Sequence, residues 1–213
     1  MIKGYLFDYG GTLDTQGCHW GKVIWHAYER FGVPVRWEHF KDAYVHGERT
    51  LGSQSIIQPD DTFRTTLATK LDLQLDYLST HQLFTDDRVD LDKAKSQLLE
   101  ALYAQTRNVV EESREMLTLL KKRYPLALVS NFYGNLETVL EEMHLRDVFD
   151  HVVESAVVGV RKPDPQIFVI ALERMGLAAA DVMVVGDSMK NDIAPAQSLG
   201  CQTTWIRGEE WKD

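Results

Sequence analysis

The hydrophobic and polar positions divide this chain into three parts. It opens with a short apolar run at residues 5–7, which ends at Asp8 and a glycine turn. A run of this length, bounded by glycines, is typical of a buried strand. Apolar side chains then recur at helical spacing as far as about residue 108, without strand-like alternation. Beyond that point short apolar runs alternate with amphipathic segments, which predicts strands alternating with helices.

The middle part predicts a group of amphipathic helices. In the first of them Trp20, Val23 and Ala27 share one face, and Gly32 ends the helix. The helices are expected over residues 19–31, 37–44, 62–78 and 91–103. His46 and Arg49 of the YVHGERTL segment are then expected in a connection between two helices, where they could contact a substrate.

The last part predicts a parallel sheet. Strands are expected at residues 126–129, 151–154, 182–185 and 202–206, and helices at 111–123, 135–145, 166–175 and 192–199. Such alternation favours right-handed crossovers between parallel strands. The expected fold class is α/β, a doubly wound parallel sheet with an inserted α-helical cap. We assign residues 1–14 and 109–213 to the catalytic core and residues 15–108 to the cap.

Composition narrows the possible partners. Of 213 residues, 44% are hydrophobic and 26% charged, which is ordinary for a soluble globular protein. The net charge of −9 argues against nucleic acid or an anionic membrane surface as the main partner. Two cysteines make no disulfide framework, and no apolar run reaches the ~18 residues of a membrane span. With no secretory leader at its start, the chain is expected to be cytoplasmic. Its oligomeric state stays open.

Reactive polar side chains follow three of the apolar runs. These are Asp8 with Thr12, Ser130 with Asn131, and Asp187 with Asp192, while a loop adds Lys162. The carboxyl ends of parallel strands meet at one edge of a sheet, so these groups are expected in one crevice. Clustered carboxylates repel one another, which makes a hard cation such as Mg²⁺ a natural occupant. Lys162, Ser130 and the amides of the glycine turn, including Gly11, suit an oxyanion such as phosphate.

Four short segments give the chain a family resemblance. LFDYGGTLD, LVSN, RKPDP and VVGDSMKND follow one another in this order. With them the whole chain resembles the haloacid dehalogenase-like (HAD) superfamily of aspartate-nucleophile hydrolases. The resemblance implies that Asp8 is the nucleophile and forms an aspartyl-phosphate. It also implies that Thr12 positions the turn and that Ser130 and Lys162 contact the phosphate. The implied magnesium ligands are Asp8, Asp187, Asp192 and the backbone carbonyl of Gly10.

Gly10 departs from the family pattern. Phosphatases of the family carry a second aspartate two residues after the nucleophile, as general acid and base, and here that carboxylate is absent. General acid–base catalysis contributes about 10²–10⁴-fold, so its loss should slow a phosphatase least for a good leaving group. His19 could replace the acid or could be a packing residue. We include His19, Arg49, Asn131 and Gly11 as expected substrate contacts.

Three functions remain open on the sequence. The first is a magnesium-dependent phosphatase acting on a small phosphorylated metabolite. The second is a different hydrolysis on the same nucleophile. Haloacid dehalogenases have a similar Tyr-Gly-Thr turn but lack the acidic signature, and phosphonatases use a cap lysine as a Schiff base, for which Lys22 is a candidate. The third is a catalytically weak regulatory protein that binds phosphate esters. Its only support is Gly10.

Overall fold

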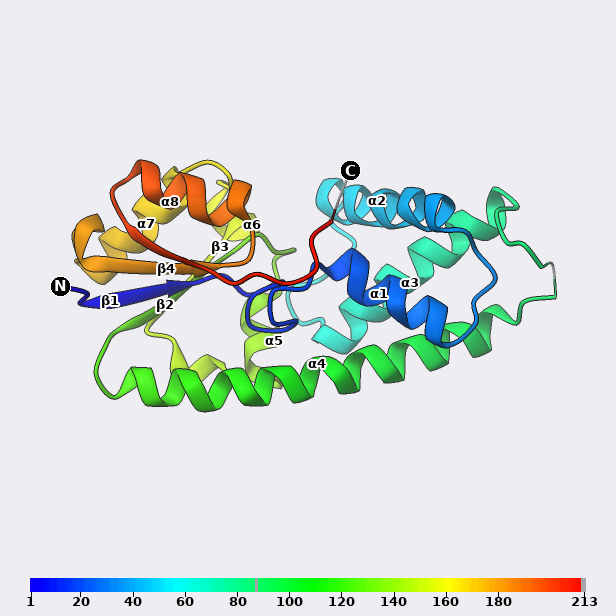
Figure 1. Ribbon diagram of the computed structural model, residues 1–213, viewed down its shortest axis with the longest axis horizontal. Coiled ribbons are helices and arrows are strands. Elements are labelled where there is room, and N and C mark those ends of the chain that lie inside the picture. Colours follow the sequence, from blue (N-terminus) through cyan, green and yellow to red (C-terminus); the bar gives the residue numbers. More distant parts are fainter. Residues whose placement is uncertain (87, 212–213) are drawn as a thin grey trace.

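Five parallel strands form the centre of the core in the computed structural model, which describes residues 1–86 and 88–211 (Figure 1). The strands are β1 (Gly4–Phe7), β2 (Leu126–Ser130), β3 (His151–Glu154), β4 (Val182–Gly186) and β5 (Gln202–Trp205), and they lie side by side in the order β3-β2-β1-β4-β5. The predicted α/β fold with a parallel sheet is therefore confirmed. Position 87 of the predicted cap and positions 212–213 of the predicted core lie outside the described residues.

Helices cover both faces of this sheet. Side chains alternate between the faces of each strand, so Leu6 packs with Ala127 and Phe168 on one face, and Phe7 packs with Leu117 on the other. The helices are α1 (Trp20–Arg30), α2 (Trp37–Ser53), α3 (Phe63–Thr80), α4 (Leu91–Lys121), α5 (Leu136–Glu142), α6 (Ser155–Val158), α7 (Gln166–Met175) and α8 (Ala194–Ser198). Short 3-10 turns occur at Arg146–Val148 and Ala179–Asp181, and a π-turn at Met189–Ile193. The helix expected at 192–199 is thus divided between this π-turn and α8.

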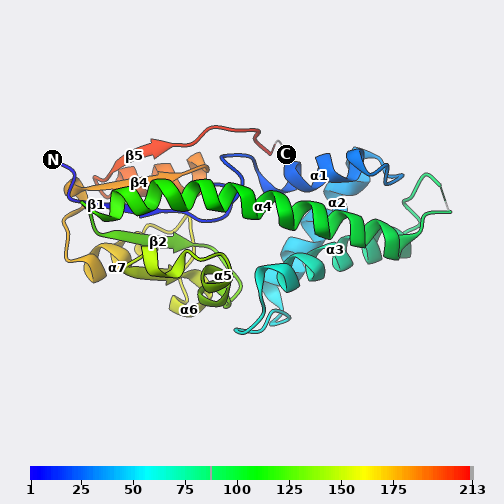
Figure 2. The same cartoon turned by 90° about the horizontal axis from the view of Figure 1, so that it is seen from below.

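Helix α4 is one long helix where the sequence predicted two. It runs unbroken from Leu91 to Lys121 and underlies both the core and the other helical group (Figures 1 and 2). Buried positions at Leu98, Leu102 and Thr106 continue its apolar face across the polar stretch that suggested a break. The predicted end of the cap at residue 108 falls inside this helix, and the domain division stays a prediction.

Helix α2 is also longer than predicted, and it contains the segment that the sequence assigned to a connection. His46 and Arg49 are therefore helical, and both are exposed. Gly47 does not break the helix because it packs against α3. A Cβ there would meet Gln74 and Leu73 at an ordinary distance of 3.7 Å.

Helices α1–α3, which we call the cap helices, lie beyond the carboxyl ends of the strands (Figure 1). The chain leaves β1 in one direction to reach β2 and β3, and later continues on the other side to β4 and β5. Open α/β sheets bind ligands where the strand order reverses in this way, here beside the end of β1. Within the described residues, no helix has both the length and the apolar character that crossing a membrane requires.

Candidate active site

Three carboxylates converge at the carboxyl ends of β1 and β4. Asp8 follows β1, Asp187 follows β4, and Asp192 lies in the π-turn that comes next. Each offers an oxygen within 4.8 Å of the oxygens of the other two. Asp8 is 6% exposed and Asp192 only 1%. Three acids from two distant segments of the sequence therefore form one largely buried cluster.

Lys162 is the cation of this cluster. Its ammonium lies 2.5 Å from Asp8 Oδ1 and 2.6 Å from Asp192 Oδ1, and the residue is only 5% exposed. Asn131 fixes the backbone from which this side chain extends. The Asn131 amide donates to the Lys162 carbonyl at 3.0 Å, and the Lys162 N–H donates to Asn131 Oδ1 at 2.9 Å. Asn131, a predicted substrate contact, thus positions the lysine.

The glycine turn after β1 fits closely around the acids. Gly11 has a φ of +95°, and a Cβ there would overlap the Asp187 carboxylate, so the turn needs glycine at this position. The Thr12 hydroxyl lies 3.2 Å from Asp8 Oδ2 and 3.3 Å from Asp187 Oδ1. The N–H of Gly11, expected to bind phosphate, donates instead to Asp14 Oδ1 at 2.7 Å.

Asp14 connects this turn to the cap helices. Besides the Gly11 N–H it accepts a hydrogen bond from Trp20 Nε1 at 2.9 Å, and it is only 2% exposed. Burial raises the pKa of Asp14 to about 7, against the lowering effect of these two hydrogen bonds. Both of its oxygens are engaged, which makes Asp14 a positioning residue at the junction of core and cap.

The acids of the cluster hold protons more tightly than free aspartates do. Burial raises the pKa of Asp8 to about 7; Lys162 opposes this effect, and Asp192 and Asp187 add to it. Burial and Asp192 likewise raise the pKa of Asp187 to about 6. Burial lowers the pKa of Lys162, yet Asp8 and Asp192 raise it above its usual range. One ammonium therefore leaves excess negative charge among three acids.

This donor set fits a magnesium ion. Carboxylate oxygens are the ligands that hard divalent cations prefer, and the cluster of Asp8, Asp187 and Asp192 has the charge that such a cation would neutralise. The carbonyl of Gly10 stays a predicted fourth ligand.

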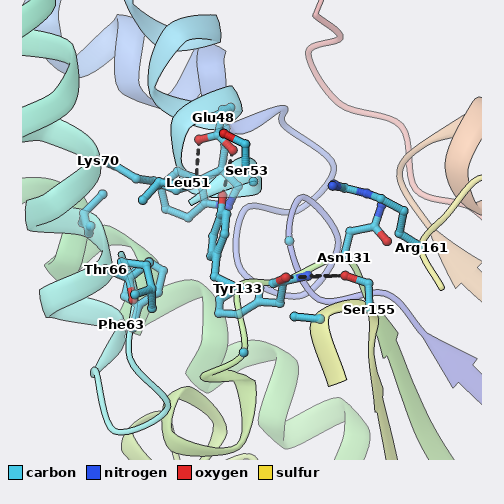
Figure 3. A pocket seen from close by; sticks show the side chains of 18 of the residues that line it. Glu48, Leu51, Ser53, Phe63, Thr66, Lys70, Asn131, Tyr133, Ser155 and Arg161 are labelled. Atoms are coloured by element: carbon cyan, nitrogen blue, oxygen red, sulfur yellow. Dashed lines mark hydrogen bonds and ion pairs between the residues drawn. The ribbon is translucent and has the colours of Figure 1, made fainter. Parts of the chain in front are cut away.

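A pocket of about 800 Å³ opens between the cap helices and the core beside this cluster (Figure 3). Gly10 and Asp187 lie at its core side, and Glu48 and Lys70 line it from α2 and α3. A second recess of about 590 Å³ is lined by Asp8, Lys162 and Ser130, which is 1% exposed at the end of β2. The nucleophile candidate thus has access to a cavity large enough for a small metabolite.

Comparison with known proteins agrees with this geometry. The family model described as haloacid dehalogenase-like hydrolase matches residues 2–200. The chain belongs to this family. As a haloacid dehalogenase-like hydrolase it is an enzyme, and its acid cluster lies at the carboxyl ends of the parallel strands β1 and β4.

Its relatives in sequence include enzymes named as phosphatases. The chain is 40% identical over 106 residues to mouse haloacid dehalogenase-like hydrolase domain-containing protein 3, covering 49% of this chain and 42% of the mouse protein. It is 31% identical over 107 residues to glyceraldehyde 3-phosphate phosphatase of Pyrococcus abyssi, covering 49% and 44%. It is 36% identical over 93 residues to the Escherichia coli pyrimidine 5'-nucleotidase YjjG, covering 43% and 41%. The matched segments span less than half of each relative.

Solved structures share the fold over almost the whole chain. A dehalogenase superposes with a TM-score of 0.62 at 20% identity, covering 96% of this chain and 84% of the other. The HAD-hydrolase YfnB from Bacillus subtilis, bound to magnesium, gives a TM-score of 0.54 at 16% identity, covering 96% and 88%. At these identities the likeness concerns the fold alone.

The other predicted site residues of this hydrolase lie in different surroundings. His19 lines both cavities, and its Nδ1 accepts from the Gly21 N–H at 3.0 Å, as the N-cap of α1. Arg49 is exposed and is not among the residues that line the described cavities, because it lies beside the pocket-lining face of α2. Lys22 pairs with Glu209 at 3.4 Å and lies over the ring of Trp37, outside the pocket.

Sequence reasoning missed a second polar group of the pocket. Lys70 pairs with Glu48 at 2.8 Å, and the Tyr133 hydroxyl donates to the other Glu48 oxygen at 2.7 Å (Figure 3). Glu48 follows the buried Tyr44 by four residues, so the helical spacing alone could have placed it on the inner face of α2.

Proposed function

We propose that this hydrolase is a magnesium-dependent phosphatase of a small phosphorylated metabolite. The observation that carries the proposal is the contact of the Lys162 ammonium with both Asp8 and Asp192. In this contact a cation lies beside Asp8, the proposed nucleophile, next to acids that suit a metal ion. Phosphoryl transfer demands this combination, because charge on the transferring group must be neutralised.

In the proposed reaction, an oxygen of Asp8 attacks the phosphorus of the ester. The bond from phosphorus to the leaving oxygen breaks, the electron pair departs with that oxygen, and an aspartyl-phosphate forms. Lys162 stabilises the negative charge on the phosphoryl oxygens, and Thr12 orients Asp8. A water molecule then attacks the phosphorus, releasing phosphate and restoring Asp8. Bound Mg²⁺ would add Lewis-acid stabilisation of the same charge.

Gly10 determines which esters react well. No carboxylate stands at this position to protonate the leaving oxygen, so the oxygen must take its proton from solvent or another group. The loss of rate caused by the missing acid is smallest when the leaving group is a stable anion. We therefore expect aryl phosphates to be hydrolysed much faster than alkyl phosphates.

The test is an assay of an aryl and an alkyl phosphate, with and without Mg²⁺, using the wild type and Asp8→Asn. We expect turnover of the aryl ester that needs Mg²⁺ and disappears in Asp8→Asn. Circular dichroism and a thermal melt verify that the variant is folded. Turnover without metal, or turnover that survives in a folded Asp8→Asn, refutes the proposal.

The alternative reactions have less support. A phosphonatase needs a neutral cap lysine to form a Schiff base, and Lys22 lies outside the pocket. Lys70 lines the pocket, but although burial lowers its pKa, Glu48 and the neighbouring tyrosines raise it well above its usual range. Chloride release from a 2-haloacid without metal would establish a dehalogenase. Tight binding of phosphate esters with no turnover across a broad panel would establish a regulatory binding protein.

A further inference from the structure

Two consecutive cations extend from one loop into different parts of the site. Lys162 reaches the acid cluster, whereas Arg161, the residue before it, lines the large pocket between core and cap. Because Asn131 holds both backbone polar groups of Lys162, the starting point of the Arg161 side chain is fixed relative to Asp8. The loop therefore presents one cation to Asp8 and one to the large pocket.

The Arg161 side chain extends from the core toward the cap helices (Figure 3). A Cβ built on Gly52, in the last turn of α2, would lie 3.8 Å from Arg161 Nη1. The guanidinium thus lies against the cap wall of the pocket while the residue remains exposed. It is accessible to a ligand that enters between cap and core.

The charges facing this pocket leave Arg161 without a partner. Lys70 is neutralised by Glu48, which also accepts from Tyr133. Asp14 is occupied by Gly11 and Trp20, and Asp187 belongs to the acid cluster. Across residues 1–86 and 88–211, Arg161 makes no ion pair and no side-chain hydrogen bond. A pocket cation without a counter-charge is suited to bind one from the ligand.

We propose that Arg161 binds a second anionic group on the leaving-group side of the substrate. The substrate class is then a phosphate monoester that carries a further oxyanion, either a carboxylate or a second phosphate. The planar guanidinium can donate two parallel hydrogen bonds to either group, which a lysine cannot do. The pocket volume of about 800 Å³ accommodates such a leaving group. This inference rests on the proposed phosphatase function.

The test compares matched aryl esters, which should react despite Gly10. They are 4-carboxyphenyl phosphate, its uncharged analogue 4-carbamoylphenyl phosphate, and hydroquinone bisphosphate. We expect the wild type to have a higher kcat/KM for one or both of the esters whose leaving group carries a carboxylate or a second phosphate. In Arg161→Gln that preference should fall about 10- to 100-fold, as for loss of a hydrogen bond to a charged group, with the carbamoyl ester unchanged. Comparison of kcat/KM for the carboxyphenyl ester and the bisphosphate shows whether the site prefers a carboxylate or a phosphate.

Arg123→Gln is the matched control, because Arg123 is an exposed arginine just after α4 and lies outside the pocket. It should leave all three esters unaffected. If Arg161 serves only to neutralise the end of α2, Arg161→Gln will change all esters equally and lower the melting temperature. That result, or a wild type without preference, overturns the inference.

Failure of the proposed phosphatase function gives a different pattern. In that case the wild type turns over none of the three esters. Titration calorimetry with the same esters then measures the preference directly as a ratio of dissociation constants. A preference for the charged esters that is lost in Arg161→Gln supports the anion site without catalysis, and equal affinities refute it.

Discussion

The ammonium of Lys162 lies 2.5 Å from the Oδ1 atom of Asp8, at the buried end of β1. Lys162 also contacts Asp192. Its side chain therefore connects the loop after α6 to the residues that follow β1 and β4. Breaking a buried ion pair by removing one partner is strongly unfavourable, because the remaining charge is left without compensation. Removal of this ammonium should therefore destabilise the fold around the site as well as impair catalysis.

We predict that Lys162→Met weakens both activity and stability. The variant leaves Asp8 and Asp192 uncompensated, and we expect a loss of about 3–5 kcal/mol in the free energy of unfolding. Loss of charge stabilisation should reduce kcat by about 10²–10³-fold. Denaturant melts and aryl phosphate kinetics measure the two effects, with the exposed Lys122→Met as control. Wild-type stability in Lys162→Met would contradict the role of the ammonium in the cluster.

Stabilisation by Mg²⁺ should increase with pH. Burial is the main cause that raises the pKa of Asp8 from 3.8 to about 7. The folded protein therefore holds the Asp8 proton more tightly than the unfolded chain does. The stability that Asp8 contributes is full below about pH 4 and is lost as the pH rises through 7. The metal-free protein should therefore become less stable over this range. A magnesium ion at this cluster would bind the ionised oxygens and compete with protons, so the rise in melting temperature on adding Mg²⁺ should be small near pH 5 and large near pH 8. Thermal melts over this range measure it.

Asp187→Asn is the control for the metal experiment. Removing one carboxylate of the cluster should abolish most of the Mg²⁺-induced shift at every pH. A shift that is independent of pH in the wild type, or that persists in Asp187→Asn, would place the ion elsewhere.

The sequence predicted the core well because each of its signals is local. An apolar run followed by Asp8, or by Asp187, defines both a strand and the polar group at its end. Once the strands are parallel, topology alone brings these ends together. The helix boundaries were harder, since Gly47 and the polar stretch around Thr106 resemble breaks and are tolerated only because of packing against other helices.

Contacts between distant segments could not be predicted from local patterns. After β5 the chain crosses to the cap helices (Figure 1). There the ring centroid of Trp211 lies 4.9 Å from that of Tyr44 and 5.4 Å from that of Trp37. In the same segment Glu209 pairs with Lys22, the lysine that the sequence offered as a Schiff-base candidate, and this lysine lies outside the pocket. No periodicity in the sequence around Trp211 indicates what it packs against.

We predict opposite effects for two glycine-to-alanine changes in the cap helices. A Cβ at Gly21 would overlap the ring of Trp211, so Gly21→Ala should displace this side chain and lower the melting temperature. Gly47→Ala meets only ordinary contacts, and the helix should gain about 0.5–1 kcal/mol. Tryptophan fluorescence and thermal melts distinguish the two, with a red shift expected only for Gly21→Ala. Equal stabilisation by both would show that Trp211 does not rest on α1.

The last prediction concerns the missing acid. Gly10 has room for a side chain: a Cβ would have Trp20 Cδ1, at 4.0 Å, as its near neighbour, and the backbone φ lies outside the left-handed region. Gly10→Asp should therefore fold normally and point a carboxylate into the pocket that Gly10 lines. We expect alkyl phosphate hydrolysis to rise, by up to about 10²–10⁴-fold, while aryl phosphate hydrolysis changes little. Gly10→Ala controls for the added Cβ and should raise neither. If Gly10→Asp is folded and alkyl turnover does not rise, another group of this pocket already protonates the leaving oxygen, and His19→Gln should then depress alkyl turnover selectively.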